Sequence, residues 1–174
     1  CLVGSEMCIR DSNHSDRDLT DYLIRLEKAI DNPSVKVVQC KTVEELVKAS
    51  EIICTTTPSK EPVLPNDREL LRGKCIIAIG SYTPDMREIP DAIWDLVERV
   101  YIELPYACEE SGDLSQPLAE GRLKKEQTVL MSDYLAEDPE EITDTGETTY
   151  FKSVGMGLFD VCIAQKILEM TKER

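Results

Sequence analysis

Two residues near the centre of the chain, Gly80 and Ser81, have the types and the position expected of a ligand-binding loop. They directly follow Cys75–Ile79, an apolar run without alternation that starts behind Gly73. Such a run is typical of a strand buried on both faces of a parallel sheet. In open α/β sheets, ligands bind just beyond the carboxyl ends of the strands. Gly80 would let backbone approach a ligand closely, and Ser81 offers a hydroxyl. An ordinary exit from strand to loop would look the same.

The segments around this stretch alternate between strand-like and helix-like patterns. Strands are expected at 35–39, 51–56, 75–79, 100–103 and 148–152, and helices at 19–30, 42–49, 67–71, 91–97, 104–110 and 158–170. The stretch 128–134 is apolar enough to pack but ambiguous in type, and 137–147 reads as an acidic, solvated loop. This order predicts an α/β fold in which a parallel sheet is joined by crossover helices.

Composition narrows the class of partner and the compartment. With 34 acidic and 20 basic residues the formal charge is −14, which argues against nucleic acid or an anionic membrane as partner. No apolar run has the length of a membrane span. The seven cysteines include no CxxC pair, and His14 is the single histidine, so no metal site is expected. Reduced thiols predict a cytoplasmic protein, with Cys54, Cys75 and Cys162 in the core.

The first twelve residues are expected to be non-native. They resemble the translation of a transposon-type sequencing adapter, and Met7–Ser12 fits the frame ATG TGT ATA AGA GAC AGn. We therefore set residues 1–12 apart from the fold. On this interpretation the chain is a fragment whose preceding part is missing.

Four stretches in order resemble the ornithine cyclodeaminase/mu-crystallin family. They are Ser50–Thr57, Ala78–Glu88, Glu110–Leu114 and Phe151–Met156. The resemblance implies a truncated Rossmann-type dinucleotide-binding domain over residues 13–157. It also implies that the C-terminal helix, residues 158–174, returns to a missing domain that handles substrate and dimerisation. The full-length protein would then be a homodimer.

The same resemblance assigns the adenosine end of a dinucleotide to the start of this domain. Asn13, His14 and Ser15 fall where the family meets the adenosine ribose, with Arg17 one turn away. An acid there would hold a 2′-hydroxyl and favour NAD. A neutral or basic site tolerates a 2′-phosphate, so NADP is favoured over NAD. A helix N-terminus with an exposed arginine is the plainer alternative.

The remaining cofactor positions follow from the same comparison. Thr56 and Thr57 match the strand end that passes the ribose and phosphates, although β-branched strand residues would also look like this. Gly80 and Ser81 would lie beside the nicotinamide, and Ser153 near its amide. Lys152 is expected as a structural ion-pair partner. The segment 154–157 contains GxG without the GxGxxG spacing, and no such phosphate loop follows a first strand, so the fragment alone should bind dinucleotide poorly.

The residue expected to decide the reaction is Tyr82. Genuine ornithine cyclodeaminases carry an aspartate two residues after the glycine that matches Gly80, and this chain has Tyr82 there. The catalytic residue is therefore unknown, and Tyr82 is expected to line the pocket. The resemblance implies an NAD(P)-dependent reductase that transfers a hydride to a cyclic ketimine acid, a small imino acid. The alternatives are ornithine cyclodeaminase, a non-enzymatic binder of nucleotide and small ligand, and an inert fragment.

Overall fold

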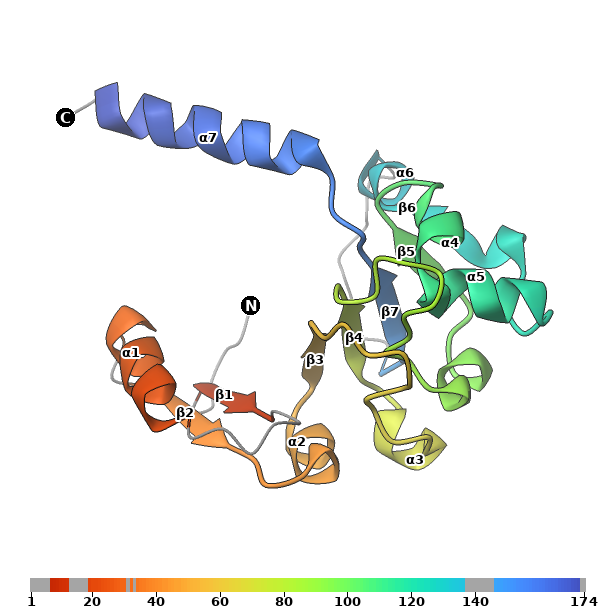
Figure 1. Ribbon diagram of the computed structural model, residues 1–174, viewed down its shortest axis with the longest axis horizontal. Helices are drawn as coiled ribbons and strands as arrows, with labels where there is room; N and C mark the ends of the chain where they lie inside the picture. Colours follow the sequence, from red (N-terminus) through yellow and green to blue (C-terminus); the bar gives the residue numbers. More distant parts are fainter. Residues whose placement is uncertain (1–6, 13–18, 31, 33, 137–145, 173–174) are drawn as a thin grey trace. The chain divides into compact units, whose positions relative to one another are not determined.

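The computed structural model describes residues 7–12, 19–30, 32, 34–136 and 146–172 of the chain (Figure 1). The predicted site residues Asn13, His14, Ser15 and Arg17 lie outside the described residues. The chain divides into two compact units, residues 1–50 and 51–174, and each is described by itself.

The described residues of the first unit form two short strands and two helices. Its elements are β1 (Met7–Asp11), α1 (Thr20–Ile30), β2 (Val35–Gln39) and α2 (Val43–Ala49). The two strands pair in parallel, from Met7 opposite Val35 to Asp11 opposite Gln39. At the start of α2 the Thr42 hydroxyl accepts a hydrogen bond from the Glu45 N–H at 3.1 Å. The predicted helix start is therefore confirmed.

Strand β1 lies inside the segment that we set apart from the fold. Its pairing with β2 gives Met7–Asp11 a regular place in a two-stranded sheet. Pairing of this kind requires extended backbone and says little about the origin of the residues, because the bonds are made by main-chain groups. The non-native origin of residues 1–12 stays a prediction.

The second unit is built on a five-stranded parallel sheet. Its strand order is β3-β4-β7-β5-β6, so the last strand in sequence lies between β4 and β5 (Figure 1). The strands are β3 (Ile52–Thr55), β4 (Cys75–Ala78), β5 (Val100–Ile102), β6 (Thr128–Leu130) and β7 (Thr149–Lys152). The connecting helices are α3 (Arg68–Leu71), η1 (Asp91–Asp95), α4 (Ala107–Glu110), α5 (Gly112–Ala119), η2 (Lys125–Gln127) and α6 (Met131–Ala136). The predicted parallel α/β architecture is confirmed.

One face of this sheet forms the core. Ile53, Ile76, Tyr150 and Val100 lie side by side across four strands, and none is more than 2% exposed. Trp94 of η1 packs on Tyr150 with its ring at 70° and the centroids 5.8 Å apart. Edge-to-face packing of this kind adds stability beyond the area that it buries.

The opposite face is only partly covered, which corrects the expectation that Cys75–Ile79 is buried on both faces. Cys75 and Ile77 are half-buried, and Ile79 is 43% exposed. On the neighbouring strand β3, Cys54 is exposed. The prediction that Cys54 lies in the core was wrong, because the described residues of the second unit by themselves fully cover only one face of its sheet.

Two helices differ from the sequence-based expectation. The segment after Pro90 forms a 3-10 turn over five residues rather than a helix to Val97. In addition, Ser111 ends α4 and also begins α5, which the sequence did not predict. The Ser111 hydroxyl accepts a hydrogen bond from the Asp113 N–H at 3.3 Å, so the residue expected to end a helix also caps the next one.

The C-terminal helix α7 (Gly157–Lys172) was predicted, and its apolar side chains are exposed. The exposed fractions include 63% for Val161, 60% for Ile163 and 60% for Leu168. Cys162 is exposed as well, so its placement in the core was wrong. The apolar pattern of α7 predicts that the helix is buried, because a helix that is apolar over most of its circumference needs a partner. The pattern does not show whether that partner lies within this chain.

Candidate functional site

Four strands of the second unit end at one level of the sheet. The pairing register sets Thr55, Ala78, Lys152 and Ile102 in one row, at the carboxyl ends of β3, β4, β7 and β5. The residues after these four strand ends therefore lie along one edge. In open α/β sheets this is the edge where ligands bind.

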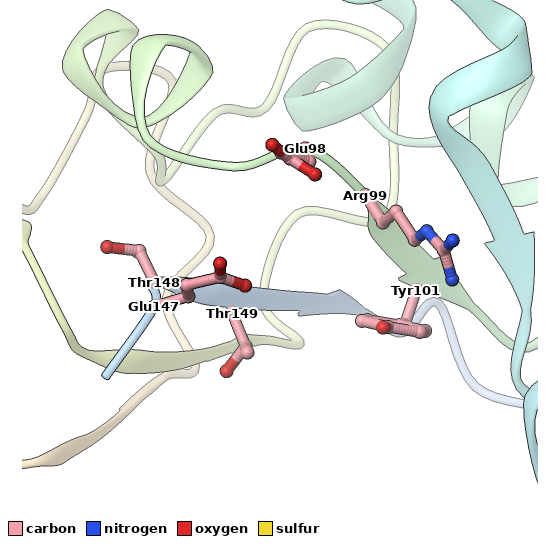
Figure 2. Close-up of a pocket in the computed structure, with 6 residues that line it drawn as sticks. All are labelled: Glu98, Arg99, Tyr101, Glu147, Thr148 and Thr149. Atoms are coloured by element: carbon pink, nitrogen blue, oxygen red, sulfur yellow. The ribbon is translucent and has the colours of Figure 1, made fainter. Parts of the chain in front are cut away.

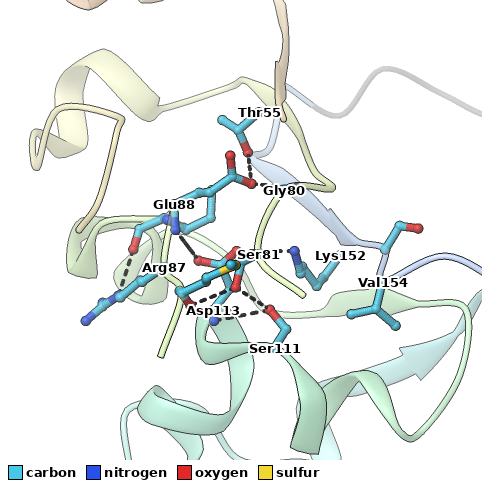
Figure 3. Close-up of polar contacts among 12 residues, drawn as sticks. Thr55, Gly80, Ser81, Arg87, Glu88, Ser111, Asp113, Lys152 and Val154 are labelled. Atoms are coloured by element: carbon cyan, nitrogen blue, oxygen red, sulfur yellow. Dashed lines mark hydrogen bonds and ion pairs between the residues drawn. The ribbon is translucent and has the colours of Figure 1, made fainter. Parts of the chain in front are cut away.

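The carboxylate of Glu88 ties the first two strand ends together. It accepts hydrogen bonds from the Thr55 hydroxyl at 2.9 Å, the Gly80 N–H at 2.8 Å and the Thr57 N–H (Figure 3). Glu88 is fully buried. Hydrogen bonds to a buried charged group are strong, and three donors offset the cost of burying the carboxylate. The loops that begin at Thr56 and Ser81 are thus held in fixed positions.

We call the Glu88 carboxylate with its three donors the clamp. A second buried carboxylate, Asp113 of α5, connects this clamp to β7. Its Oδ1 accepts the N–H groups of Glu88 at 2.7 Å and Ile89 at 3.0 Å. Its Oδ2 forms an ion pair with Lys152 Nζ at 3.3 Å, and both side chains are fully buried (Figure 3). The ion pair predicted for Lys152 is confirmed.

Burial is the largest influence on the pKa values of Asp113 and Lys152. It raises the pKa of Asp113, against the opposing effect of Lys152, and it lowers the pKa of Lys152, against the opposing effect of Asp113. Both shifts favour the neutral forms because a low-dielectric interior disfavours charge. The removal of either partner would leave the other ionisable group buried without its partner, which is strongly destabilising.

The Ser81 hydroxyl is used inside the protein. It donates to the Met86 carbonyl at 2.7 Å and lies 2.9 Å from the Ser111 hydroxyl, and both serines are fully buried. The loop after β4 is in this way joined to the start of α5. Any contact of this residue with a ligand in this arrangement would come from its backbone.

A third carboxylate, Glu103, holds the loop after β7. Its Oε1 accepts hydrogen bonds from the Ser153 hydroxyl at 2.7 Å, the Val154 N–H at 2.7 Å and the Gly155 N–H at 2.9 Å. Gly155 has a φ of 83°, a conformation that favours glycine. The strand end of β5 therefore fixes the turn after its neighbour.

The structure brings together five of the predicted site residues. Thr56 and Thr57 follow β3, Gly80 and Ser81 follow β4, and Ser153 follows β7. The side chain of Thr56 is exposed, and those of Thr57 and Ser153 are half-buried. These three hydroxyls are thus the accessible polar side chains among the predicted residues that the structure describes.

Sequence reasoning missed the three carboxylates that organise this edge. Glu88, Asp113 and Glu103 all belong to a charge class that is normally solvated, so no sequence pattern indicated that they would be buried. Glu103 offered one usable signal, since it is the last residue of the strand expected at 100–103. An acid at the carboxyl end of a buried strand lies beside the loops that follow the neighbouring strands, so its carboxylate can accept hydrogen bonds from them.

A surface pocket lies at the other end of the strands. It has a volume of about 270 Å³ and is lined by Glu98, Arg99, Tyr101, Glu147, Thr148 and Thr149 (Figure 2). Arg99 and Thr148 precede β5 and β7, so this pocket belongs to the amino ends of the strands. Ligands of open α/β sheets bind at the opposite edge, and we do not assign this pocket to the candidate site. In the part of the chain that the structure describes, no helix is both long and apolar enough to cross a membrane.

Several curated relatives of the chain are reductases by name. The chain is 31% identical over 137 residues to Delta(1)-pyrroline-2-carboxylate reductase of Bacillus cereus, a match over 75% of this chain and 40% of the relative. It is 30% identical over 137 residues to ketimine reductase mu-crystallin of Mus musculus, over 75% of this chain and 39% of the relative. The chain thus spans about two fifths of the length of these relatives.

Solved structures share the fold. Delta(1)-pyrroline-2-carboxylate reductase of Thermococcus litoralis, in complex with NADH and L-proline, matches with a TM-score of 0.80 and 19% identity over 96% of this chain and 51% of that chain. Iminosuccinate reductase of Paracoccus denitrificans, in complex with NAD+, matches with a TM-score of 0.75 and 20% identity over 96% of this chain and 49% of that chain. The family model for ornithine cyclodeaminase/mu-crystallin proteins matches residues 20–174. The chain therefore belongs to the ornithine cyclodeaminase/mu-crystallin family.

Proposed function

We propose that the whole protein is an NAD(P)-dependent reductase of cyclic ketimine acids of the pyrroline- or piperideine-2-carboxylate class. This chain would supply much of its cofactor-binding domain. The observation that carries the proposal is the similarity to relatives named as reductases of this class, at 30–31% identity. The sheet edge built by Glu88, Asp113 and Glu103 agrees with it, because ligands bind at that edge in open α/β sheets.

The accessible groups at this edge suit a dinucleotide. The hydroxyls of Thr56 and Thr57 can bond ribose and phosphate oxygens, and Ser153 can bond the carboxamide of a nicotinamide. We infer that the Gly80 backbone lies beside the ring. The bound nicotinamide supplies the hydride, so the residues of this chain bind and orient rather than react.

The preference between NADP and NAD rests on the adenosine end. Asn13, His14, Ser15 and Arg17 provide no acid for a ribose 2′-hydroxyl, and we infer that NADP is preferred. Replacing Arg17 by Glu should then raise the Kd for NADPH more than the Kd for NADH, as measured by fluorescence titration of the whole protein. Equal changes for both cofactors would contradict the preference.

Tyr82 bears on the choice between the two family reactions. It lies in the loop after β4 and is 51% exposed, where it can line a substrate pocket. It cannot supply the carboxylate that the family resemblance requires for ornithine deamination and cyclisation. We therefore expect Tyr82→Asp to retain imine reduction. A variant that loses imine reduction but folds normally would show that Tyr82 does more than line the pocket.

The decisive assay uses the whole protein and three substrates. Oxidation of NADPH or NADH should be observed with pyrroline-2-carboxylate or piperideine-2-carboxylate, and no ammonia should be released from ornithine in the presence of NAD+. Turnover of ornithine alone would establish a cyclodeaminase instead. Cofactor binding without turnover of any of the three would favour a non-enzymatic binder.

The remaining organisation is proposed on the same basis. We infer that residues 13–157 form part of the cofactor domain and that residues 158–174 pack against a substrate and dimerisation domain of a homodimer. The exposed apolar side chains of α7 support this, because such a helix needs a partner. A cytoplasmic location is supported by the free thiols of all six described cysteines.

A further inference from the structure

Glu103 uses its two carboxylate oxygens very differently. Oε1 accepts all three hydrogen bonds from the Ser153–Gly155 turn. Oε2 is buried and has no hydrogen-bond partner among the described residues, and the side chain as a whole is 8% exposed. Oε1 therefore makes every hydrogen bond that positions the turn, and Oε2 makes none. A neutral amide could hold the turn equally well.

Buried acids outnumber buried bases around this carboxylate, although Lys152 interacts with it electrostatically. Glu88, Asp113 and Glu103 are three buried acids, and Lys152 is the buried base among the described residues of this edge. Lys152 already forms its ion pair with Asp113. Arg87, which is 13% exposed, is directed to Asp91 and to the Ile89 carbonyl. Buried acids thus outnumber buried bases at this edge, although the burial of a carboxylate that the turn does not require is costly.

A negative charge on Glu103 would assist hydride transfer from a bound nicotinamide. As the hydride leaves the reduced ring with its electron pair, the ring becomes a cation. The hydride forms the new C–H bond at the carbon of the substrate C=N, the π electrons pass to nitrogen, and nitrogen takes a proton from solvent. A fixed negative charge near the ring stabilises the positive charge that develops in the transition state.

We propose that Glu103 is a positioning residue of the cofactor site whose charge, acting beside the Ser153 turn, favours the oxidised and positively charged nicotinamide. The inference rests on the proposed function, because it takes the ring to lie against Ser153. The carboxylate of Glu103 thus has two roles. Its Oε1 holds the turn in place by hydrogen bonds, and its negative charge acts on the nicotinamide.

Glu103→Gln separates the two roles in the whole protein. The amide oxygen can keep the three hydrogen bonds of Oε1, while the amide nitrogen replaces the oxygen that has no partner. We expect the Kd for the oxidised cofactor to rise about tenfold relative to the Kd for the reduced cofactor. The loss of one unit charge that acts through the protein interior changes a binding constant by a factor of this order. Glu103→Asp keeps the charge but retracts the carboxylate, so it should weaken both affinities with little change in their ratio.

Glu98→Gln is the matched control. Glu98 is exposed and lies at the other end of β5, so this substitution makes the same change of charge far from the carboxyl edge. It should leave the ratio unchanged. Fluorescence titrations with both cofactor forms give the affinities, and thermal unfolding shows whether each variant is folded.

The outcomes separate this inference from the proposed function. If the affinity ratio of folded Glu103→Gln equals that of the wild type, or if Glu98→Gln changes the ratio as much, the electrostatic role is wrong while the reductase proposal stands. If Glu103→Gln does not fold, a changed ratio in Glu103→Asp overturns the inference. If the wild type binds neither cofactor form, the proposed function is wrong and this inference falls with it.

Discussion

Gly80 lies where two loops approach each other more closely than a side chain allows. A Cβ added to this residue would lie 2.2 Å from both the N and the O of Thr57 and 2.6 Å from Glu88 Oε1. The close approach lets the Gly80 N–H reach the Glu88 carboxylate at 2.8 Å. The absence of a side chain at position 80 is thus a condition for the clamp at the strand ends.

Gly80→Ala should therefore destabilise the chain. We expect the free energy of unfolding to fall by about 2 kcal/mol, because an extra methyl group forces packed backbone apart. Urea denaturation measures the change. Gly157→Ala is the control, since a Cβ there meets nothing within 4 Å, and its unfolding midpoint should not fall below that of the wild type because alanine favours helix. Equal midpoints for both variants would contradict the close approach.

The carboxylate of Asp91 gives a pH-dependent contribution to stability. Its pKa is lowered, first by the hydrogen bond from Arg87 and further by Arg122, whose NH1 lies 2.6 Å from Asp91 Oδ2. A pKa that is lower in the folded state stabilises above the unfolded pKa of about 4, and this contribution is lost as the pH falls through the folded pKa.

Asp91→Asn should thus cost about 1 kcal/mol at neutral pH, a modest value because solvent screens the partly exposed pair. The difference between wild type and variant should shrink below about pH 4 as Asp91 becomes protonated. Urea denaturation at a series of pH values tests this. A difference that stays constant, or that grows toward acid, would show that the charge of Asp91 is not involved.

At the scale of single residues, the position of Gly80 at the end of a predictable strand marked it as a candidate. Thr56 and Ser153 were assigned by the resemblance to the family, and their role in cofactor binding stays a prediction. The fully buried Glu88 was missed because its importance arises from donors that are far away in sequence, Thr55 and Thr57. No local pattern in a single sequence reports contacts of this range.

At the scale of elements, the strands were predicted well and the helices less so. The expected strand at 35–39 matches β2, and four further strands agree within one residue at either end, because short β-branched runs between polar segments are clear signals. The type of 128–134 stayed open since it contains both β6 and the start of α6. Helix α5 was missed because Ser111-Gly112 reads as a helix end, although Ser111 also caps the next helix.

The cap at Ser111 makes a testable prediction. Its hydroxyl accepts from the Asp113 N–H and lies 2.9 Å from the Ser81 hydroxyl, and the residue is fully buried. Ser111→Ala should lower the free energy of unfolding by about 2 kcal/mol, through the lost cap and the buried hydroxyl left behind.

Thermal or urea unfolding measures this change, and Ser115→Ala, inside the same helix, is the control. Alanine favours helix, so we expect Ser115→Ala to be neutral or slightly stabilising. If both alanine variants unfold alike, the start of α5 does not depend on the Ser111 cap.

At the scale of the whole molecule, the two units differ in how much they bury. Among the described residues of the first unit, Cys40 and Val47 are the buried ones, and α1 has none. The second unit buries a continuous row of apolar residues across β3, β4, β7 and β5. Local stability depends on such burial, so the first unit should open more readily.

Hydrogen exchange should reveal this difference in the isolated chain. Amides of β2 are expected to exchange at least about tenfold faster than those of β4 and β7, because they open without disturbing the larger core. Exchange measured by mass spectrometry on peptides from both units provides the test. Equal protection of β2 and β7 would mean that the two units unfold together.

The position of β7 has a consequence for how the protein is made. This strand lies between β4 and β5, yet it leaves the ribosome after the other four strands of its sheet. Until then β4 and β5 have no common neighbour, Glu103 has no turn to hold, and Asp113 has no lysine. A nascent chain thus carries two incomplete halves of the sheet, each with open main-chain groups, from the synthesis of β5 until that of β7. Completion of the core and completion of the candidate site are the same late event, so a ribosome that stops early releases a chain that has neither.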